Sequence, residues 1–430
     1  MRVRNHGRAH AALSVVGVGA LLALTACAPS AEPSVSASPP PTPEASSPAP
    51  YTGPVSFVGD ELSWLLPSAE DILALIPSAT EVSAPSDALE QISDGGGPEF
   101  APAICGVLYM EQSLDSLGAR TMSWAMPSDT EYSSNSVIAM QFADEAHVTA
   151  RMDELERAAS ECGEFDYGSP QTFASVVADD EDGVRALAGT LNADPSSGGW
   201  RVFHGFAAVG NTLVHLMTSL PDDAPIDAAA AVELLQTTAI GAKSELMESL
   251  TSTLPAGATE PEGDASVPWA EWSLTGSGVG PIRLGDTYDD VVAVLPDAAV
   301  TPPSYPGGPS TFTSPDGTAS LMVTATEDGT ISEITAGARS DEEDAGVDGM
   351  AAPHALEVRI GDPVSSALAA FPSGTRVHIS SSDQWAYCAA DREGRLLTFH
   401  TTREDTDSTE ARIIGITTAD STLRGDLTVE

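Results

Sequence analysis

The sequence IRLGD at residues 282–286 recurs as VRIGD at residues 358–362, which is 76 positions further along the chain. In both copies apolar and polar residues alternate as they do in a half-buried strand, and the Gly-Asp pair then predicts a turn. A run with apolar residues at helical spacing follows each copy and ends at a proline. We therefore expect residues 269–430 to hold two copies of one unit, at about residues 278–350 and 354–430.

Strand-rich sequence follows both predicted helices in the same order, over residues 311–334 and 386–416. This helix-then-strands order resembles the tandem-repeat fold of β-lactamase inhibitory protein and its small outer-membrane lipoprotein relatives. The resemblance implies that two helix-plus-sheet units join into one concave sheet, with the helices on one face and a protein partner on the open face. Phe312, Tyr387 and Phe399 are then the candidate protein-binding residues, unless their strand parity places them in the core instead.

The preceding part of the chain, residues 56–250, is expected to form an α+β domain. Residues 136–142 are apolar and partly alternating, which predicts a strand. Asp144 can cap a following helix whose apolar residues recur every three to four positions up to Cys162. Two further apolar runs flank a Gly-Asn turn at residues 210–211 and predict a hairpin, after which an Ala-rich helix ends the domain.

This order of elements resembles the extracellular sensor domain of the mycobacterial serine/threonine kinase PknH, which also occurs on many actinobacterial lipoproteins. The match covers about residues 60–248 and includes the cysteine-ended helix and the hairpin sequences GGWRVF and VGNTLVHL. The resemblance implies a module that binds a ligand in a central cleft rather than a catalyst. It also implies two disulfides, of which the helix cysteine Cys162 and its partner Cys105 are kept here, whereas the cysteine beside the Gly-Trp is missing.

The N-terminus has the pattern of an export signal. Three arginines precede an apolar run that ends in LTAC at residues 24–27, and this run is shorter than the roughly 20 apolar residues of a spanning helix. LTAC resembles the lipobox of bacterial lipoproteins, in which the cysteine is lipidated and the peptide is cut before it. We therefore expect residues 1–26 to be a signal peptide and Cys27 to carry the lipid; the alternative is an ordinary signal peptide with a chance cysteine.

Two low-complexity segments separate these parts. Residues 27–55 are rich in Pro, Ser and Ala, and residues 251–268 are rich in Pro, Gly and acidic residues. Such compositions cannot bury a core and favour an extended chain. The sequence thus predicts an α+β protein with a sensor-like domain at residues 56–250 and a tandem-repeat domain at residues 269–430.

The three remaining cysteines lie in two different predicted domains. Outside the membrane a disulfide can persist, and Cys105 and Cys162 lie in the same predicted domain. Their bridge would staple the end of the helix to the core, and closing that loop contributes roughly 4 kcal/mol in the chain-entropy model. Cys388 lies in the other predicted domain, where it is interpreted as a small buried hydrophobe, with an intermolecular partner as the alternative.

The charge is strongly acidic, with 18 Lys and Arg against 63 Asp and Glu and a formal net charge of −45. Lys243 is the only lysine. Such a chain offers no basic patch, which excludes nucleic acid as a partner, and its field would repel anionic headgroups. Solubility near an anionic envelope is the plain account of this charge, and capture of a cationic ligand or peptide is the alternative.

Motifs for catalysis or metal binding are absent from the sequence, which holds no GxSxG, HExxH or SxxK. His204 and His215 could face each other across the predicted hairpin, which would give at most a two-ligand site and is interpreted as structural. The acidic runs at residues 179–183 and 341–344 lack the ligand alternation of an EF-hand loop and are interpreted as solvated turns. We expect no catalytic residue, no metal and no cofactor.

Together these features predict a lipoprotein anchored on the extracytoplasmic face of the cell membrane that acts as a ligand-binding or sensory module and not as an enzyme. A protein-binding inhibitor or assembly factor for an envelope enzyme, acting through the second domain, is the alternative, and a cell-wall hydrolase comes third. The expected partners are the membrane, through the lipid on Cys27, and an extracytoplasmic small molecule, glycan or protein.

Overall fold

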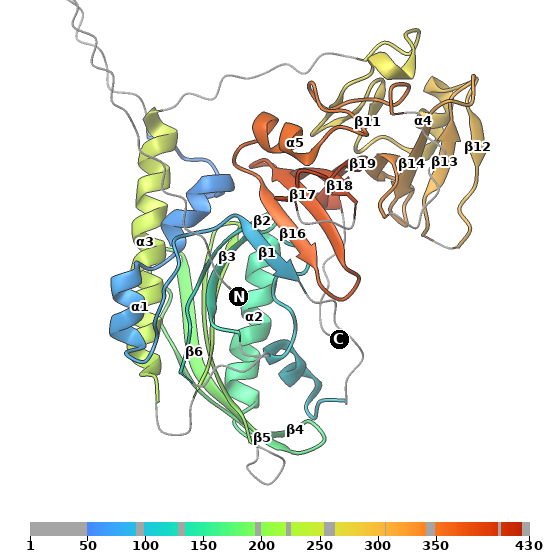
Figure 1. The fold of residues 1–430 in the computed structure, drawn as a ribbon. Helices are drawn as coiled ribbons and strands as arrows, with labels where there is room; N and C mark the ends of the chain where they lie inside the picture. The colour runs from blue at the N-terminus through green and yellow to red at the C-terminus, as the bar shows by residue number, and fades with distance from the viewer. Residues whose placement is uncertain are drawn as a thin grey trace, which may run out of the picture. The chain divides into compact units, whose positions relative to one another are not determined.

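Two large sheets, each packed against helices, make up the α+β fold that the sequence predicts (Figure 1). The structure is a computed structural model. It describes residues 50–91, 99–127, 134–193, 199–220, 225–252, 263–305, 307–340, 349–402 and 406–423. The predicted signal peptide, Cys27 and most of both predicted linkers lie outside these residues. The described residues cluster as one unit by their contacts.

The first sheet is antiparallel and follows the strand order β2-β3-β8-β7-β6-β5-β4. Its strands are β2 (Gly118–Ser123), β3 (Ser136–Gln141), β8 (Thr212–Ser219), β7 (Arg201–Val209), β6 (Val184–Ala193), β5 (Pro170–Val177) and β4 (Phe165–Asp166). Its helical segments are η1 (Gly59–Leu65), α1 (Ala69–Leu75), η2 (Ala103–Leu108), α2 (Glu145–Glu161) and α3 (Ala228–Ser252). The predicted hairpin is confirmed, since β7 and β8 pair across Gly210 and Asn211.

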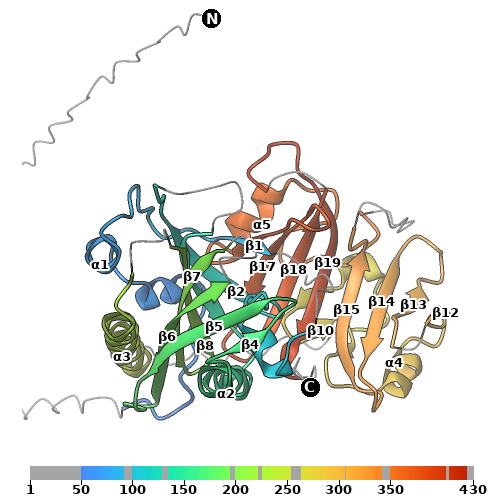
Figure 2. The ribbon, with the colours of Figure 1, turned by 90° about the horizontal axis from the view of Figure 1, so that it is seen from below.

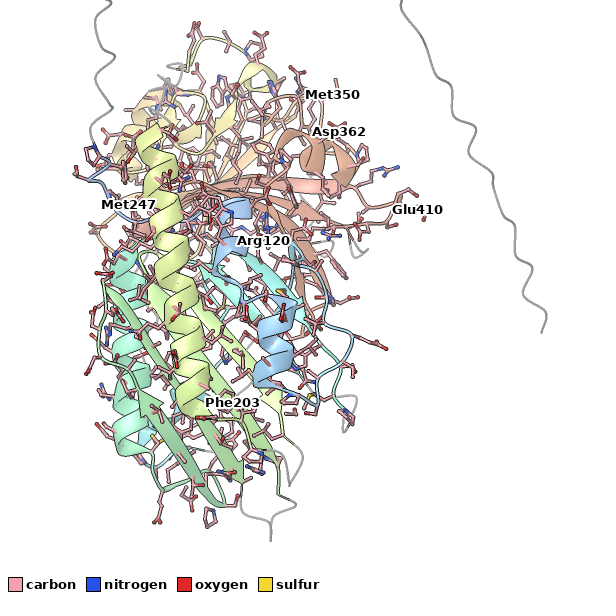
Figure 3. All side chains as sticks on the ribbon, turned by 90° about the vertical axis from the view of Figure 1, so that its left-hand side faces the viewer. Arg120, Phe203, Met247, Met350, Asp362 and Glu410 are labelled. Carbon is pink, nitrogen blue, oxygen red and sulfur yellow. A yellow bond between two sulfur atoms is a disulfide. The ribbon has the colours of Figure 1, made fainter. Side chains whose placement is uncertain are left out.

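Opposite faces of this sheet bury two separate cores. On one face, Phe203 and Val214 pack in a cluster with Leu235 of α3, which runs along the sheet (Figure 3). On the other face, Phe206 packs in a cluster with Leu155 of α2 and with residues of η2. Alternate residues of a strand point to opposite faces, so a central strand such as β7 contributes to both cores. The predicted cap of α2 is also confirmed, because the Asp144 carboxylate accepts the amide hydrogen bond of residue 147 at 3.0 Å.

The second sheet has the order β1-β16-β17-β18-β19-β15-β14-β13-β12, and most of its strands are seen side by side in Figure 2. Its strands are β1 (Ala88–Gln91), β16 (Thr375–Ile379), β17 (Gln384–Ala390), β18 (Arg395–Thr401), β19 (Ile413–Asp420), β15 (Ile331–Gly337), β14 (Ser320–Ala325), β13 (Ser310–Thr313) and β12 (Ala299–Thr301). Helices α4 (Tyr288–Val294) and α5 (Val364–Ala370) and a small sheet of β9 (Leu274–Thr275), β10 (Gly278–Val279) and β11 (Ile282–Arg283) accompany it.

The IRLGD and VRIGD motifs adopt the same turn. Gly285 and Gly361 have φ angles of 90° and 93°, in the region that favours glycine. Each glycine amide donates to a strand carbonyl at 2.8 Å, that of Ile331 in the first copy and that of Ile413 in the second. The aspartate that follows each glycine accepts a hydrogen bond from the amide of the motif's arginine, at 2.9 and 2.8 Å. The two turns are therefore closed by the same contacts.

Downstream of the turns the two copies stay aligned at the same spacing of 76 residues. Helix α4 at residues 288–294 corresponds to α5 at residues 364–370. The β14–β15 ladder shifts register between Thr324 and Ala325, and the β18–β19 ladder shifts between His400 and Thr401, at the corresponding positions. Strands β15 and β19 pair with each other, so the copies share one sheet.

The three aromatic residues proposed as protein-binding anchors are buried, and that prediction is wrong. Phe312, Tyr387 and Phe399 are each exposed by 1% or less. Phe399 lies directly opposite Tyr387 in the β17–β18 ladder, and its ring lies 5.3 Å from that of Phe371, which follows α5. Strand parity thus turns these side chains toward the helices, into the core of the repeat, where a partner cannot reach them.

The face opposite these helices is partly covered as well. Val377 and Cys388 pack with Leu89 and Ile104, in the core that also contains residues of α2. Burial raises the pKa of the Cys388 thiol to about 11 and keeps it protonated. Cys388 has no disulfide partner in the described part of the chain; it is half-buried and packs against this core, so it is less buried than the sequence interpretation expects.

The two sheets are joined by strand pairing and by a buried charge. Strand β1 pairs in parallel with β16, and just before β1 the chain bridges Ser86 to Thr121 of β2. Arg120 is only 4% exposed. Its guanidinium contacts Asp60 at 2.6 Å and donates to the backbone carbonyls of residues 373 and 374, at 3.0 and 3.2 Å. Asp60 compensates the charge, and the two carbonyl hydrogen bonds form only while the turn before β16 stays docked on the first sheet.

Replacement of Arg120 by Met should therefore destabilise the folded protein by about 3 kcal/mol, because carbonyls that now receive charged hydrogen bonds would be left buried without a donor. Urea unfolding followed by circular dichroism measures this change. Arg157→Met is the matched control, since the Arg157–Glu161 pair on α2 is more than half exposed on its arginine side and contributes at most about 0.5 kcal/mol. We call this connection between the two sheets, through Arg120 and the β1–β16 pairing, the joint. Equal effects of the two substitutions would contradict the contribution of Arg120 to the joint.

Candidate functional site

Four aromatic side chains from distant parts of the sequence meet beside β4. We call Phe100, Tyr109, Tyr167 and Trp200 the aromatic cluster. The rings of Phe100 and Tyr167 are stacked, with centroids 4.3 Å apart and planes 2° apart. Tyr109 lies 5.0 Å from Phe100 and 4.8 Å from Tyr167, tilted by 42° and 43°. Trp200 stands almost perpendicular to Tyr109, at 5.8 Å and 84°.

The disulfide predicted from the sequence holds this cluster in place. Cys105 and Cys162 are bonded, with their Cα atoms 5.8 Å apart, and both are fully buried. Cys105 lies in η2, whose C-cap is Tyr109. Cys162 is the C-cap of α2, and the chain from there passes through β4 to Tyr167. The bridge therefore ties together the two segments that carry Tyr109 and Tyr167.

Backbone pairing places Phe100 on Tyr167. Ala101 and Asp166 form an antiparallel bridge, with both N–O distances at 3.1 Å, so the residues next to them lie side by side. The Phe100 ring also packs on Gly106 of η2, where an added Cβ atom would lie 3.1 Å from the ring. A side chain at residue 106 would therefore press on the ring, which accounts for the glycine in this close approach.

The cluster is partly open to solvent. Trp200 is 41% exposed, and the other three rings are half-buried. Glu99 and Asp166, the chain neighbours of Phe100 and Tyr167, are both exposed. Burial, together with the nearby Tyr167, raises the pKa of the Tyr109 phenol far above its usual range. Tyr109 is therefore neutral, and its hydroxyl donates to the Gln171 side-chain oxygen at 3.3 Å.

His204 and His215 do face each other, as the hairpin predicts. Their ring nitrogens Nδ1 and Nε2 lie 3.1 Å apart, and the rings stack in a row with Phe206. Burial lowers the pKa of His204 to about 4, and burial together with His204 holds the pKa of His215 well below 6.5. The described residues bring no third metal-ligating side chain to the pair. It is a neutral, hydrogen-bonded pair within the core.

A polar cluster lies on the second sheet, on the face that points away from α4 and α5. His400 Nε2 lies 2.8 Å from the Thr417 hydroxyl, which lies 2.8 Å from the Thr335 hydroxyl. Arg339 donates to Thr335 at 3.4 Å and pairs with Glu333 at 2.5 Å. These contacts link β18, β19 and β15 across the boundary between the two copies, which is a structural role.

Sequence reasoning missed the aromatic cluster. Tyr109 and Tyr167 each lie within five residues of a disulfide cysteine, and that proximity was an available signal. Phe100, five residues before Cys105, offered the same signal. Trp200 carries no such signal, because its place depends on the start of β7.

Comparisons with known proteins do not identify a family or a function for the chain. No family model matches the chain, and no curated protein matches it. One similar solved structure is the extracellular domain of PknH from Mycobacterium tuberculosis, at 13% identity and a TM-score of 0.30, covering 47% of this chain and 100% of that chain. Another is an uncharacterized protein from Mycobacterium smegmatis, at 16% identity and a TM-score of 0.26, covering 43% of this chain and 97% of that chain. Both similarities concern the fold alone.

None of the helices in the described part of the chain is both long enough and apolar enough to cross a membrane.

Because His204 and His215 are buried and neutral in the folded protein, we predict that acid lowers the stability of the fold. Both imidazoles are neutral when folded, whereas in the unfolded chain they take up protons below about pH 6.5. Stability should therefore fall as the pH drops from 7 to 5, by about 2 kcal/mol for a histidine whose folded pKa is about 4. His204→Gln should reduce that loss by a similar amount in urea titrations at the two pH values.

Phe206→Leu is the control for this measurement, because it removes packing in the same row but no titrating group. It should lower stability equally at pH 7 and pH 5. A His204→Gln variant that keeps the pH dependence of the unsubstituted protein would rule out the pair as its source.

Proposed function

We propose that the chain is an extracytoplasmic lipoprotein, held to the membrane by a lipid on Cys27, and that it acts as a ligand-binding module and not as an enzyme. The ligand is bound at the aromatic cluster. The observation that carries the proposal is the exposed Trp200 within a group of aromatic rings that a buried disulfide holds in place.

Two observations support the location. LTAC at residues 24–27 has the pattern of a lipobox. The Cys105–Cys162 bridge is of a kind that persists in oxidising compartments outside the cytoplasm and is rare within it. Both observations favour a protein that is exported and then anchored.

The aromatic cluster supports binding because of what it exposes. Burying a large aromatic side chain away from water is favourable. A group of such side chains that stays partly exposed is therefore typical of a surface that a ligand or partner covers. The disulfide, the bridge at Ala101 and Asp166, and the contact at Gly106 hold the rings before any ligand arrives. A site prepared in this way avoids part of the ordering cost of binding.

The alternative function is a protein-binding inhibitor or assembly factor that acts through the repeat. The residues proposed as its binding surface are not accessible to a partner. Phe312, Tyr387 and Phe399 are core residues, and the first half of the chain covers part of the opposite sheet face. In the described part of the repeat, no geometric feature favours this function over ligand binding at the aromatic cluster.

Lipidation is tested by Cys27→Ala in the native host. The substitution removes the only thiol at the cleavage site, so the protein should leave the membrane fraction and lose metabolic labelling by a radiolabelled fatty acid. Cys388→Ala is the control and should keep both properties, because Cys388 lies in the folded core. If the Cys27→Ala protein is still labelled by the fatty acid to the same extent, Cys27 is not the site of lipidation.

Binding at the aromatic cluster is tested by thermal shift with a panel of envelope glycans, amines and lipids. Trp200→Ala should weaken any ligand found in the panel by about tenfold, the effect expected for loss of one aromatic contact. The matched control is Trp385→Ala, which removes a tryptophan that stacks on His378 in the second sheet. A ligand whose affinity depends on Trp385 and not on Trp200 would refute the site.

A further inference from the structure

We infer that the outer edge of β5 binds an extended, basic segment of a partner protein, which adds a strand to the first sheet. We call residues 174–177, the part of β5 that extends beyond β4, the β5 edge. It lies at the opposite end of β5 from the aromatic cluster, and the inference does not depend on the function proposed for that cluster. It rests on unpaired backbone groups, exposed valines and the surrounding charge.

Strand β5 is paired fully along one side only. On its inner side it pairs with β6 over residues 171–177. On its outer side β4 reaches no further than Gln171, and the chain before β4 adds one hydrogen bond, from the Phe173 amide to the Cys162 carbonyl at 3.1 Å. Beyond Phe173, no described backbone group pairs with the outer side of β5.

The alternation of the strand shows which backbone groups point outward. The Ala178 amide donates to the carbonyl of Ala186 on β6 at 2.9 Å, so the even-numbered residues of this segment face β6. The odd-numbered residues Ser175 and Val177 therefore direct their amides and carbonyls away from the sheet, as Phe173 does with its amide. These groups can pair with an added strand without breaking any hydrogen bond of the fold.

The side chains of the β5 edge leave apolar surface in contact with water. Val176 is 40% exposed and Val177 is 46% exposed, and successive residues of a strand point to opposite faces of the sheet. Ala174, on the same face as Val176, is also exposed. The Ser175 hydroxyl donates to the Ala159 carbonyl of α2 at 3.3 Å and so holds the strand against the helix. A strand paired here would cover both valines from the side.

Other outer strands of the two large sheets are protected. At the joint, β2 is bridged at Ser86 and β16 is covered by β1. Strand β12 is followed by Pro302 and Pro303, which have no amide hydrogen to donate. Proteins commonly block sheet edges in these ways. Past residue 173, the described part of β5 has neither a bridging segment nor a proline.

The charge at the end of the β5 edge is negative. The chain leaves the strand through residues 179–182, three aspartates and one glutamate that are all exposed. One Asp180 carboxylate oxygen accepts the Gly183 amide hydrogen bond at 3.0 Å, which closes the turn and keeps the acidic run at the end of the strand. A segment that pairs with Ser175 and Val177 and continues along β5 passes beside this run.

The neighbouring cations do not offset this charge, because each is already paired. Their contacts are Arg185 with Asp153 and Glu156 at 2.7 Å, Arg157 with Glu161 at 3.9 Å, and Lys243 with the carbonyl of residue 182. A second copy of the chain would bring the same acidic run and a net charge of −45 to the edge and would be repelled. A basic segment is attracted, so charge complementarity selects it as the occupant.

The test measures peptide binding to the full-length protein in detergent by fluorescence anisotropy. The probe is a labelled basic peptide, KTVKVTVK, whose valines and threonines favour an extended strand. It should bind about tenfold more tightly than its acidic analogue ETVEVTVE, and added salt should weaken it. A third peptide has the basic sequence with N-methyl groups on its four central amides. It should not bind, because it lacks the donors that a paired strand needs.

Variants of one valine locate the site. Val177→Pro removes an outward amide that makes no bond within the described fold, and should weaken the basic peptide about tenfold with little change in the unfolding temperature. Val177→Lys keeps the backbone, and should weaken the basic peptide and strengthen the acidic one. Val292→Lys is the matched control, because it makes the same change at a valine of α4 that is 40% exposed, and it should leave binding unchanged.

Other results overturn the inference in distinguishable ways. Equal binding of the basic peptide and its N-methylated form would show attraction by charge without strand pairing. Equal binding of the basic and acidic peptides would refute the selection of a basic partner, and absence of binding by all three would refute the β5 edge as a docking site. A dimer in sedimentation experiments that Val177→Lys abolishes would assign the edge to a second copy instead.

Discussion

The buried guanidinium of Arg120 is the interaction on which the arrangement of the two sheets depends. A charge removed from water in this way is stable only with a full set of partners. Those partners come from Asp60 of η1 and from backbone carbonyls at residues 373 and 374, just before β16. Because these segments are far apart in the sequence, the charge is satisfied only in the completed structure. The parallel pairing of β1 with β16 extends the same joint by four residue pairs.

This joint determines which surfaces are free to act. It covers the sheet face that carries Val377 and Cys388, and strand parity directs the large aromatic residues of the repeat into the core on the other side. The repeat therefore has a buried aromatic row on one face and a partly covered polar row on the opposite face. The exposed aromatic surface lies instead in the first half of the chain, beside the Cys105–Cys162 bridge.

The Cys105–Cys162 bridge constrains that surface. The disulfide ties η2 to the end of α2, and so fixes the spacing of Tyr109 and Tyr167. For the proposed binding, a site whose rings are already held in place avoids part of the cost of ordering side chains when a ligand arrives.

The sequence by itself determined the features that depend on neighbouring residues. The Gly-Asp turns of the duplicated motif, the Asp144 cap of α2, the hairpin at residues 210–211 and the Cys105–Cys162 pair were all predicted from local chemistry. Each needs only a few adjacent residues, or two cysteines in one domain, and these do not change their preferences with the rest of the fold.

Only the tertiary structure decided the features that depend on parity or on distant partners. A shift of one residue moves Phe312, Tyr387 and Phe399 from the surface to the core, and the alternation of the sequence did not reveal which face would be covered. The place of β1 in the second sheet and the contact of Tyr109 with Trp200 depend on pairings across more than 80 residues of chain. Such contacts form because they bury apolar surface and compensate charge in the folded state, and that balance involves the whole chain at once.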